Sequence, residues 1–99
     1  MGLRWRRKLI VFWQPGCEYC KEVLRMLPAF ADRHPEIEVL RWDATTRKGW
    51  TDVVRPPESI PSFLLLTPGM APKTLEGDTI LAKLDRMLTL TELEAWVAR

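Results

Sequence analysis

The segment Lys8–Trp13, Lys-Leu-Ile-Val-Phe-Trp, constrains the fold more than any other part of the sequence. It is a short, continuous apolar run, rich in β-branched and aromatic residues, and the turn-forming sequence Gln14-Pro15-Gly16 ends it. This pattern is typical of a β-strand buried on both faces, because a strand with one wet face would alternate apolar and polar side chains. We therefore expect residues 8–13 to form a central strand in a sheet that carries helices on its faces.

The other expected elements follow from periodicity and from turn signals. From Cys17 onward, apolar side chains recur every three or four residues, which predicts a helix that ends near His34-Pro35. We further expect a strand over 37–42, a short helix over 49–54, a strand over 60–67, an extended hairpin loop over 67–78, a strand over 79–86 and a helix that begins at the capping-box sequence Thr89-Leu90-Thr91-Glu92. The predicted class is α/β, in the order β-α-β-α-β-β-α.

Length and charge exclude several classes of protein. The chain has 99 residues, which is one domain, and a formal net charge of +2, which is too small to indicate a polyanionic partner. The basic residues Arg4, Arg6, Arg7 and Lys8 surround Trp5, and we interpret residues 1–7 as a solvated arm rather than a nucleic-acid site. No segment approaches the roughly 20 apolar residues of a membrane span.

Cys17 and Cys20 are the only cysteines in the sequence, and they lie at the start of the predicted helix. Helical positions i and i+3 lie on one face, roughly 5 to 6 Å apart, within the range that a disulfide tolerates. Unpaired backbone N–H groups and the helix dipole favour a thiolate at Cys17, whereas Cys20, one turn inside, should be more buried. Two-step thiol/disulfide exchange needs this asymmetry, because one thiol attacks and the other resolves.

Other interpretations of the pair remain open. A zinc site needs four ligands, and His34 is the only other soft donor in the chain. A purely structural disulfide would close so short a loop that it would restrict the unfolded chain little. The cysteines could also be two unrelated core residues, part of a redox-inert binding module, or the ligands of a metallochaperone-like protein that uses a partner's groups as well.

These residues together resemble the thioredoxin superfamily from Lys8 to Ala98. The resemblance rests on the strand that runs into Cys-Glu-Tyr-Cys, on the segment Ile60-Pro61-Ser62 and on the terminal strands and helix. It implies a thioredoxin-like fold with a mixed four-stranded sheet flanked by helices. It also implies that the Ile60–Pro61 bond is cis, that Pro61 faces Cys17 and that the backbone of Ile60 pairs with substrate. By the same resemblance, Trp13 and Tyr19 contribute to substrate binding.

The sequence also departs from the thioredoxin pattern. The first strand and helix of full-length thioredoxins are absent, which leaves the shorter glutaredoxin-like core. Gly16 stands where thioredoxins carry a tryptophan, and Val11 stands where they carry a buried aspartate. Glu18 is also unusual within the motif. Its carboxylate carries the same sign as the neighbouring thiolate, so we expect Glu18 to tune the pKa of Cys17 by raising it.

The sequence therefore predicts a thiol/disulfide oxidoreductase with Cys17 as nucleophile and Cys20 as resolving thiol. The expected partners are protein thiols or disulfides and a redox partner that recycles the pair, with no metal or organic cofactor and no nucleic acid. We expect a monomer, cytoplasmic as the sequence is written, or periplasmic if a signal peptide has been removed. The direction of electron flow depends on a reduction potential that the sequence does not contain.

Overall fold

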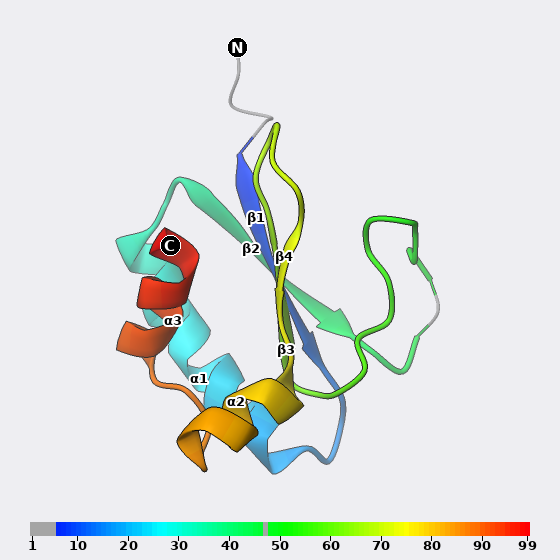
Figure 1. The fold of residues 1–99 in the computed structure, drawn as a ribbon, viewed down its shortest axis with the longest axis vertical. Coiled ribbons are helices and arrows are strands. Elements are labelled where there is room, and N and C mark those ends of the chain that lie inside the picture. Colours follow the sequence, from blue (N-terminus) through cyan, green and yellow to red (C-terminus); the bar gives the residue numbers. More distant parts are fainter. Residues whose placement is uncertain (1–5, 47) are drawn as a thin grey trace.

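A computed structural model describes residues 6–46 and 48–99 (Figure 1). Part of the predicted basic arm, including Arg4 and Trp5, lies outside the described residues, and the first strand begins at Arg7. The helices and strands are β1 (Arg7–Trp13), α1 (Glu18–Arg33), β2 (Ile37–Asp43), β3 (Ser62–Leu66), β4 (Lys73–Leu75), α2 (Gly77–Leu84) and α3 (Leu90–Ala98).

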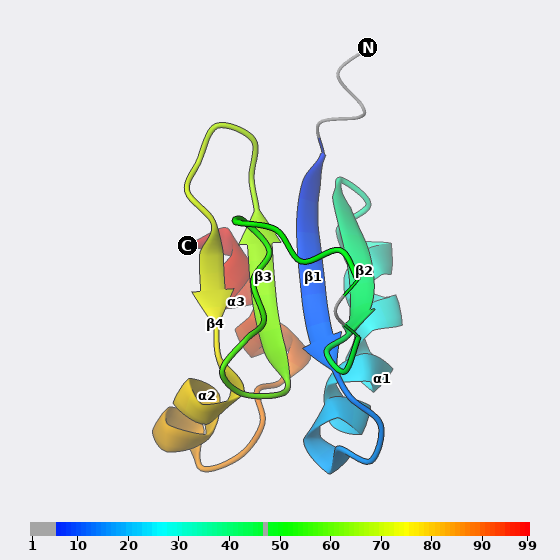
Figure 2. The ribbon, with the colours of Figure 1, turned by 90° about the vertical axis from the view of Figure 1, so that its right-hand side faces the viewer.

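The four strands form one mixed sheet in the order β2-β1-β3-β4. β1 is parallel to β2 and antiparallel to β3, and β3 is antiparallel to β4. Helices α1 and α3 cover one face of the sheet, while the segment between β2 and β3 crosses the other face and α2 lies at the lower end (Figures 1 and 2). The predicted mixed four-stranded sheet with flanking helices is confirmed.

β1 is the central strand that the apolar run predicts, and both of its faces are buried. Leu9 and Val11, each 0% exposed, pack into the main core beneath α1 and α3. Ile10 and Phe12 face the opposite side, where they belong to a second apolar cluster. In that cluster Trp42 stacks on Trp50 with a ring separation of 5.3 Å, and Phe12 packs against both rings.

Helix α1 forms as the spacing predicts. Cys17 is its N-cap and His34 its C-cap, and one face of the helix is buried against the sheet through Cys20, Val23, Leu27 and Phe30. This face is the amphipathic stripe that recurs every three or four residues in the sequence.

The predicted short helix over 49–54 is wrong. The Thr51 hydroxyl accepts hydrogen bonds from the N–H groups of Val53 and Val54, as an N-cap would, but no helical turn follows. Arg55, Pro56 and Pro57 come directly after, and proline disfavours the helical conformation in the residue before it. Gly49 precedes the turn with φ of 90°, which is outside the helical region. The segment therefore stays a loop.

The predicted strand over 79–86 is also wrong, because residues 77–84 form α2. The fourth strand lies earlier, at Lys73–Leu75, inside the segment predicted as an extended hairpin loop. Ile80, Ala82 and Leu84 suggested an alternating pattern, but Ile80, Leu81 and Leu84 are spaced as one face of a helix and pack on the main core. Asp85 ends α2 in the left-handed conformation, with φ of 57°.

Helix α3 begins at the predicted capping box. The Thr89 hydroxyl accepts a hydrogen bond from the N–H of Glu92, and the Thr89 N–H donates one to the Glu92 carboxylate at 2.8 Å. Arg86 donates two further hydrogen bonds to Glu92, at 2.7 and 2.9 Å. The Arg86 guanidinium and the backbone of Thr89 lower the pKa of Glu92 to about 2.

The lowered pKa of Glu92 predicts how stability changes in acid. The stabilisation from the Glu92 carboxylate is fully present above its ordinary value of 4.5 and is lost as the pH falls towards 2. Urea midpoints measured from pH 6 to pH 2 should therefore fall less steeply in Glu92→Gln than in the parent. Arg86→Gln should also flatten the dependence of the urea midpoint on pH, since it removes the largest cause of the lowered Glu92 pKa. Parallel profiles in the parent and in Glu92→Gln would contradict the assignment.

Candidate active site

Cys17 and Cys20 form a disulfide at the first turn of α1, with their Cα atoms 5.2 Å apart. Cys17 is partly exposed, whereas Cys20 is 1% exposed and packs beneath the helix. The Cys20 N–H donates a hydrogen bond to Cys17 Sγ at 3.1 Å. A backbone donor directed at this sulfur, together with the helix N-terminus, favours a thiolate on Cys17 when the disulfide is reduced.

A tight turn places Cys17 at the helix start. Gly16 has φ of 81°, in the left-handed region that favours glycine, and no heavy atom lies within 4 Å of the position that a Cβ would take there. The backbone conformation, rather than crowding, therefore requires glycine between Pro15 and Cys17.

The Ile60–Pro61 peptide bond lies at the same end of the sheet as the cysteines. Phe12 pairs with Ser62 in the antiparallel register of β1 and β3, so the end of β1 and the start of β3 meet at this edge (Figure 1). The bond is cis, Pro61 is less than 2% exposed, and Ile60 is partly buried against the second apolar cluster.

The remaining candidate residues surround the cysteines at the protein surface. Tyr19 is 43% exposed and Trp13, at the end of β1, is partly buried. Glu18 is exposed, and Lys21, one turn along α1, forms an ion pair with it at 3.4 Å. The roles of Trp13 and Tyr19 in substrate binding and of Glu18 in pKa tuning stay predictions.

The surroundings of Cys20 are apolar. Val11, at the position where thioredoxins carry a buried aspartate, is 0% exposed in the main core. Ser62 is the only buried polar residue in the part of the chain that the structure describes. Within those residues, no buried carboxylate is available to take a proton from Cys20.

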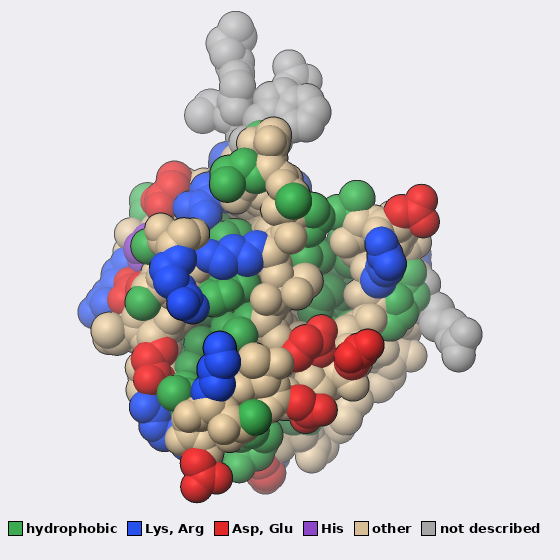
Figure 3. Space-filling view, in the orientation of Figure 1, with side chains coloured by type: hydrophobic (Ala, Val, Ile, Leu, Met, Phe, Trp, Pro, Cys, Tyr) green, Lys and Arg blue, Asp and Glu red, His purple; other side chains and the backbone are tan. Residues whose placement is uncertain are grey.

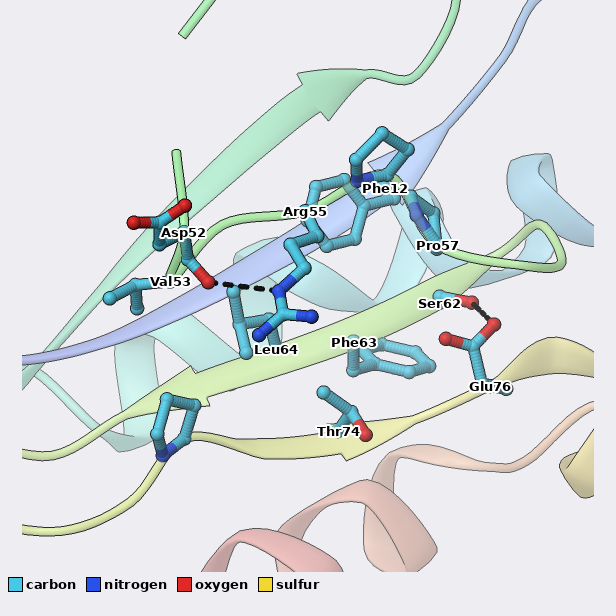
Figure 4. Close-up of a pocket in the computed structure, with 12 residues that line it drawn as sticks. Phe12, Asp52, Val53, Arg55, Pro57, Ser62, Phe63, Leu64, Thr74 and Glu76 are labelled. Carbon is cyan, nitrogen blue, oxygen red and sulfur yellow. Dashed lines mark hydrogen bonds between the residues drawn. The ribbon is translucent and has the colours of Figure 1, made fainter. Parts of the chain in front are cut away.

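Sequence reasoning missed Glu76, which joins the cis-proline segment to the start of α2. Its Oε1 atom accepts hydrogen bonds from the N–H groups of Glu58 and Ser59 and from the hydroxyl of Ser59, and it lies 3.1 Å from the hydroxyl oxygen of Ser62. Figure 4 shows Glu76 and Ser62 side by side in the wall of a cavity of about 460 Å³. No local sequence signal identifies Glu76, because it lies 14 positions after Ser62 and reaches it only through the β3–β4 pairing.

The cavity lies between residues 52–57 and strands β3 and β4. Phe12, Val53, Phe63 and Leu64 are among the apolar residues that line it. Figure 3 shows hydrophobic side chains in this hollow and acidic side chains at its lower end. Cys17 and Cys20 are not among the residues that line the cavity.

In the stretches 6–46 and 48–99, no three His, Cys, Asp or Glu side chains are grouped so that they could hold a metal ion. None of the helices within these stretches is long and apolar enough to cross a membrane.

The structure is similar to those of several thioredoxins. Thioredoxin from Fasciola hepatica superposes with a TM-score of 0.65 at 18% identity, covering 96% of this chain and 81% of that one. Chloroplastic thioredoxin z gives a TM-score of 0.71 at 15% identity, with 96% and 78% covered. Oxidised mitochondrial thioredoxin 3 from Saccharomyces cerevisiae gives 0.65 at 16% identity, with 97% and 81% covered.

By sequence, no protein-family model and no curated protein matches. The structural similarity therefore establishes the thioredoxin-like fold, as the sequence resemblance implied.

The contact between α2 and the cis-proline segment gives a test of this geometry. A Cβ atom at Gly77 would lie 2.5 Å from the Pro61 carbonyl oxygen, which is backbone and cannot rotate away. Gly77→Ala should therefore destabilise the fold by about 1 to 3 kcal/mol, as overpacking does. The free energy of urea unfolding measures this cost. Gly69→Ala is unsuitable as a control, because Gly69 has a φ of 79° and alanine would be strained there. Ala82→Gly, on the exposed side of α2, serves instead, because it measures the ordinary difference in stability between alanine and glycine in this helix.

Proposed function

We propose that this protein is a thiol/disulfide oxidoreductase that acts on protein disulfides or dithiols through Cys17 and Cys20. The observation that carries the proposal is the disulfide at the start of α1, with one accessible sulfur and one buried sulfur. Reversible exchange needs this arrangement, because the accessible sulfur meets the substrate and the buried one acts only within the protein.

In the reductive direction, the Cys17 thiolate attacks one sulfur of a substrate disulfide. A Cys17–substrate disulfide forms, the substrate S–S bond breaks and the departing substrate thiolate takes the proton that the Cys20 thiol loses. The Cys20 thiolate then attacks Cys17 Sγ, which forms the Cys17–Cys20 disulfide and releases the second substrate thiolate. Two electrons pass from the protein to the substrate, and the same steps in reverse oxidise a substrate dithiol.

Several features support a polypeptide substrate. The cis-proline segment lies at the same end of the sheet as Cys17, and in the thioredoxin superfamily this backbone pairs with the substrate as a short antiparallel strand. We assign Ile60 to that pairing and Pro61 to holding it in place. Trp13 and Tyr19, near Cys17, are proposed to contact the polypeptide on either side of the disulfide.

The chemistry needs no metal or organic cofactor, but it does need a second redox partner to return the pair to its starting state. We propose that the protein acts as a monomer, in the cytoplasm or, if a signal peptide precedes the mature chain, in the periplasm. The reduction potential of the pair would distinguish a reductase from an oxidase.

The division of roles between the cysteines is tested by two single variants. Cys17→Ser should abolish the reduction of a disulfide-bonded protein such as insulin, because the attacking sulfur is gone. Cys20→Ser should accumulate a mixed disulfide with substrate, which intact-mass spectrometry detects. Equal trapping by both variants would refute the assigned order. Failure of the parent to exchange disulfides, with both thiols titratable after reduction, would favour a redox-inert binding module.

The ion pair between Glu18 and Lys21 gives a second test. Glu18→Gln should lower the pKa of the Cys17 thiol, because it removes a like charge beside the thiolate. Lys21→Gln should raise that pKa, because it removes the cation that offsets Glu18. Thiolate absorbance titrations of both variants at low and high salt measure these effects, which should shrink with salt since both groups are exposed. An unchanged Cys17 pKa in both variants at low salt would show that Glu18 does not tune it.

A further inference from the structure

The segment 58–62, called here the proline loop, is held by a carboxylate from another part of the chain. Glu76 Oε1 accepts hydrogen bonds from the backbone N–H of Glu58 at 3.1 Å and from that of Ser59 at 2.9 Å. The hydroxyls of Ser59 and Ser62 each approach the same oxygen at 3.1 Å. The Ser62 hydroxyl has a single proton, which it shares between this oxygen and the carbonyl of Ser59 within the loop.

The hydrogen bonding is reciprocal between the proline loop and α2. Glu76 is the N-cap residue of α2, but its side chain does not cap its own helix. The loop hydroxyls supply those caps instead, since Ser62 Oγ accepts from the Gly77 N–H at 3.3 Å and Ser59 Oγ accepts from the Asp78 N–H at 3.0 Å. The helix start therefore orders the loop, and the loop satisfies N–H groups that the helix start leaves free.

This network surrounds the cis bond. Ser59 and Ser62 flank Ile60 and Pro61 in sequence, and the Pro61 carbonyl lies against Gly77, where a Cβ would be 2.5 Å away. A carboxylate that accepts from two consecutive backbone N–H groups fixes their orientation more firmly than a neutral acceptor would, because charge-assisted hydrogen bonds are shorter and stronger. The backbone of Ile60, which follows directly, is thereby held in one conformation.

We propose that Glu76 is a positioning residue for substrate binding. It holds the proline loop in the conformation that receives the backbone of an extended polypeptide beside Cys17. The inference rests on the proposed function and deepens it in two ways. It names a residue outside the Cys-x-x-Cys segment. It also predicts that the reduction of polypeptide disulfides depends on Glu76, whereas the reduction of small disulfides, which have no backbone to dock, does not.

Steady-state kinetics on two substrates test this selectivity, with dithiothreitol recycling the pair. The substrates are a disulfide-bonded peptide and bis(hydroxyethyl) disulfide. In Glu76→Ala the KM for the peptide should rise about tenfold, the loss expected when one acceptor of charge-assisted hydrogen bonds is removed. Its kcat, and kcat/KM for the small disulfide, should stay within about twofold of the parent. Glu76→Gln keeps one oxygen acceptor, so its KM should lie between those of Glu76→Ala and the parent.

Asp52→Asn is the matched control. Asp52 lines the same cavity and is exposed, and no hydrogen bond joins its carboxylate to the proline loop within the described residues. Asp52→Asn removes one negative charge from the cavity, as Glu76→Gln does, and should leave the peptide KM unchanged. A rise in Asp52→Asn equal to that in Glu76→Gln would show that cavity charge, not the loop, sets peptide affinity, and would overturn the proposal.

Amide hydrogen exchange tests the network without reference to activity. The amides of Glu58 and Ser59 should exchange at least about tenfold faster in Glu76→Ala than in the parent, because their acceptor is gone. If Glu76→Ala does not fold, Ser59→Ala replaces it, since it removes one donor to Glu76 and one cap of α2 and should also raise the peptide KM.

The outcomes separate the two proposals. A parent that exchanges neither disulfide would refute the proposed function. An active parent whose Glu76→Ala variant keeps its peptide KM, or loses activity equally on both substrates, would overturn the positioning role alone. Unchanged exchange at Glu58 and Ser59 in Glu76→Ala would overturn the network itself.

Discussion

The burial of β1 on both faces is the constraint on which the rest of the structure depends. Leu9 and Val11 need an apolar layer on one side, which α1 and α3 supply, and Ile10 and Phe12 need one on the other. Among the described residues, the segment before β3 supplies that second layer, because it brings Trp50 and Val54 across the sheet. A strand of seven residues thereby fixes the positions of both layers.

The same strand determines where the cysteine pair lies. β1 ends at Trp13, and the turn through Gly16 passes the chain directly into α1, so Cys17 is at the edge of the sheet. β3 runs antiparallel to β1, and its first residue pairs with Phe12, which brings the cis-proline bond to that edge. The neighbouring helix start of α2 then contacts Pro61 through Gly77. The start of α1, the cis-proline bond and the start of α2 therefore meet at one end of the sheet because of strand pairing. The local conformational preferences of these segments do not bring them together.

Local patterns in the sequence predicted three elements. The stripe of α1 and the capping box of α3 form as expected, since their hydrogen bonds are local. The hydrogen bonds of β1 go to the distant strands β2 and β3, but its continuous apolar run is a local pattern that predicts a strand buried on both faces. The predicted strand over 79–86 was wrong because Ile80, Ala82 and Leu84 alternate as in a strand. The same stretch also fits a helix, and the packing of Leu81 and Leu84 on the main core shows that it is one. The predicted helix over 49–54 does not form. Thr51 accepts a hydrogen bond from the Val54 N–H as a helix N-cap would, but the prolines that follow disfavour a helical conformation in the residues before them.

The sequence by itself predicted where the cysteine pair lies, since it contains one pair of cysteines three positions apart at a helix start, and a proline that opens a strand. It also predicted the asymmetry between Cys17 and Cys20, because the helix N-terminus is a local feature. Only the tertiary structure decided what holds the proline loop. Glu76 meets Ser59 and Ser62 because β4 returns antiparallel beside β3 and ends next to the residue where β3 began. No periodicity or spacing encodes that contact, because it depends on the register between two strands and on the turn that joins them.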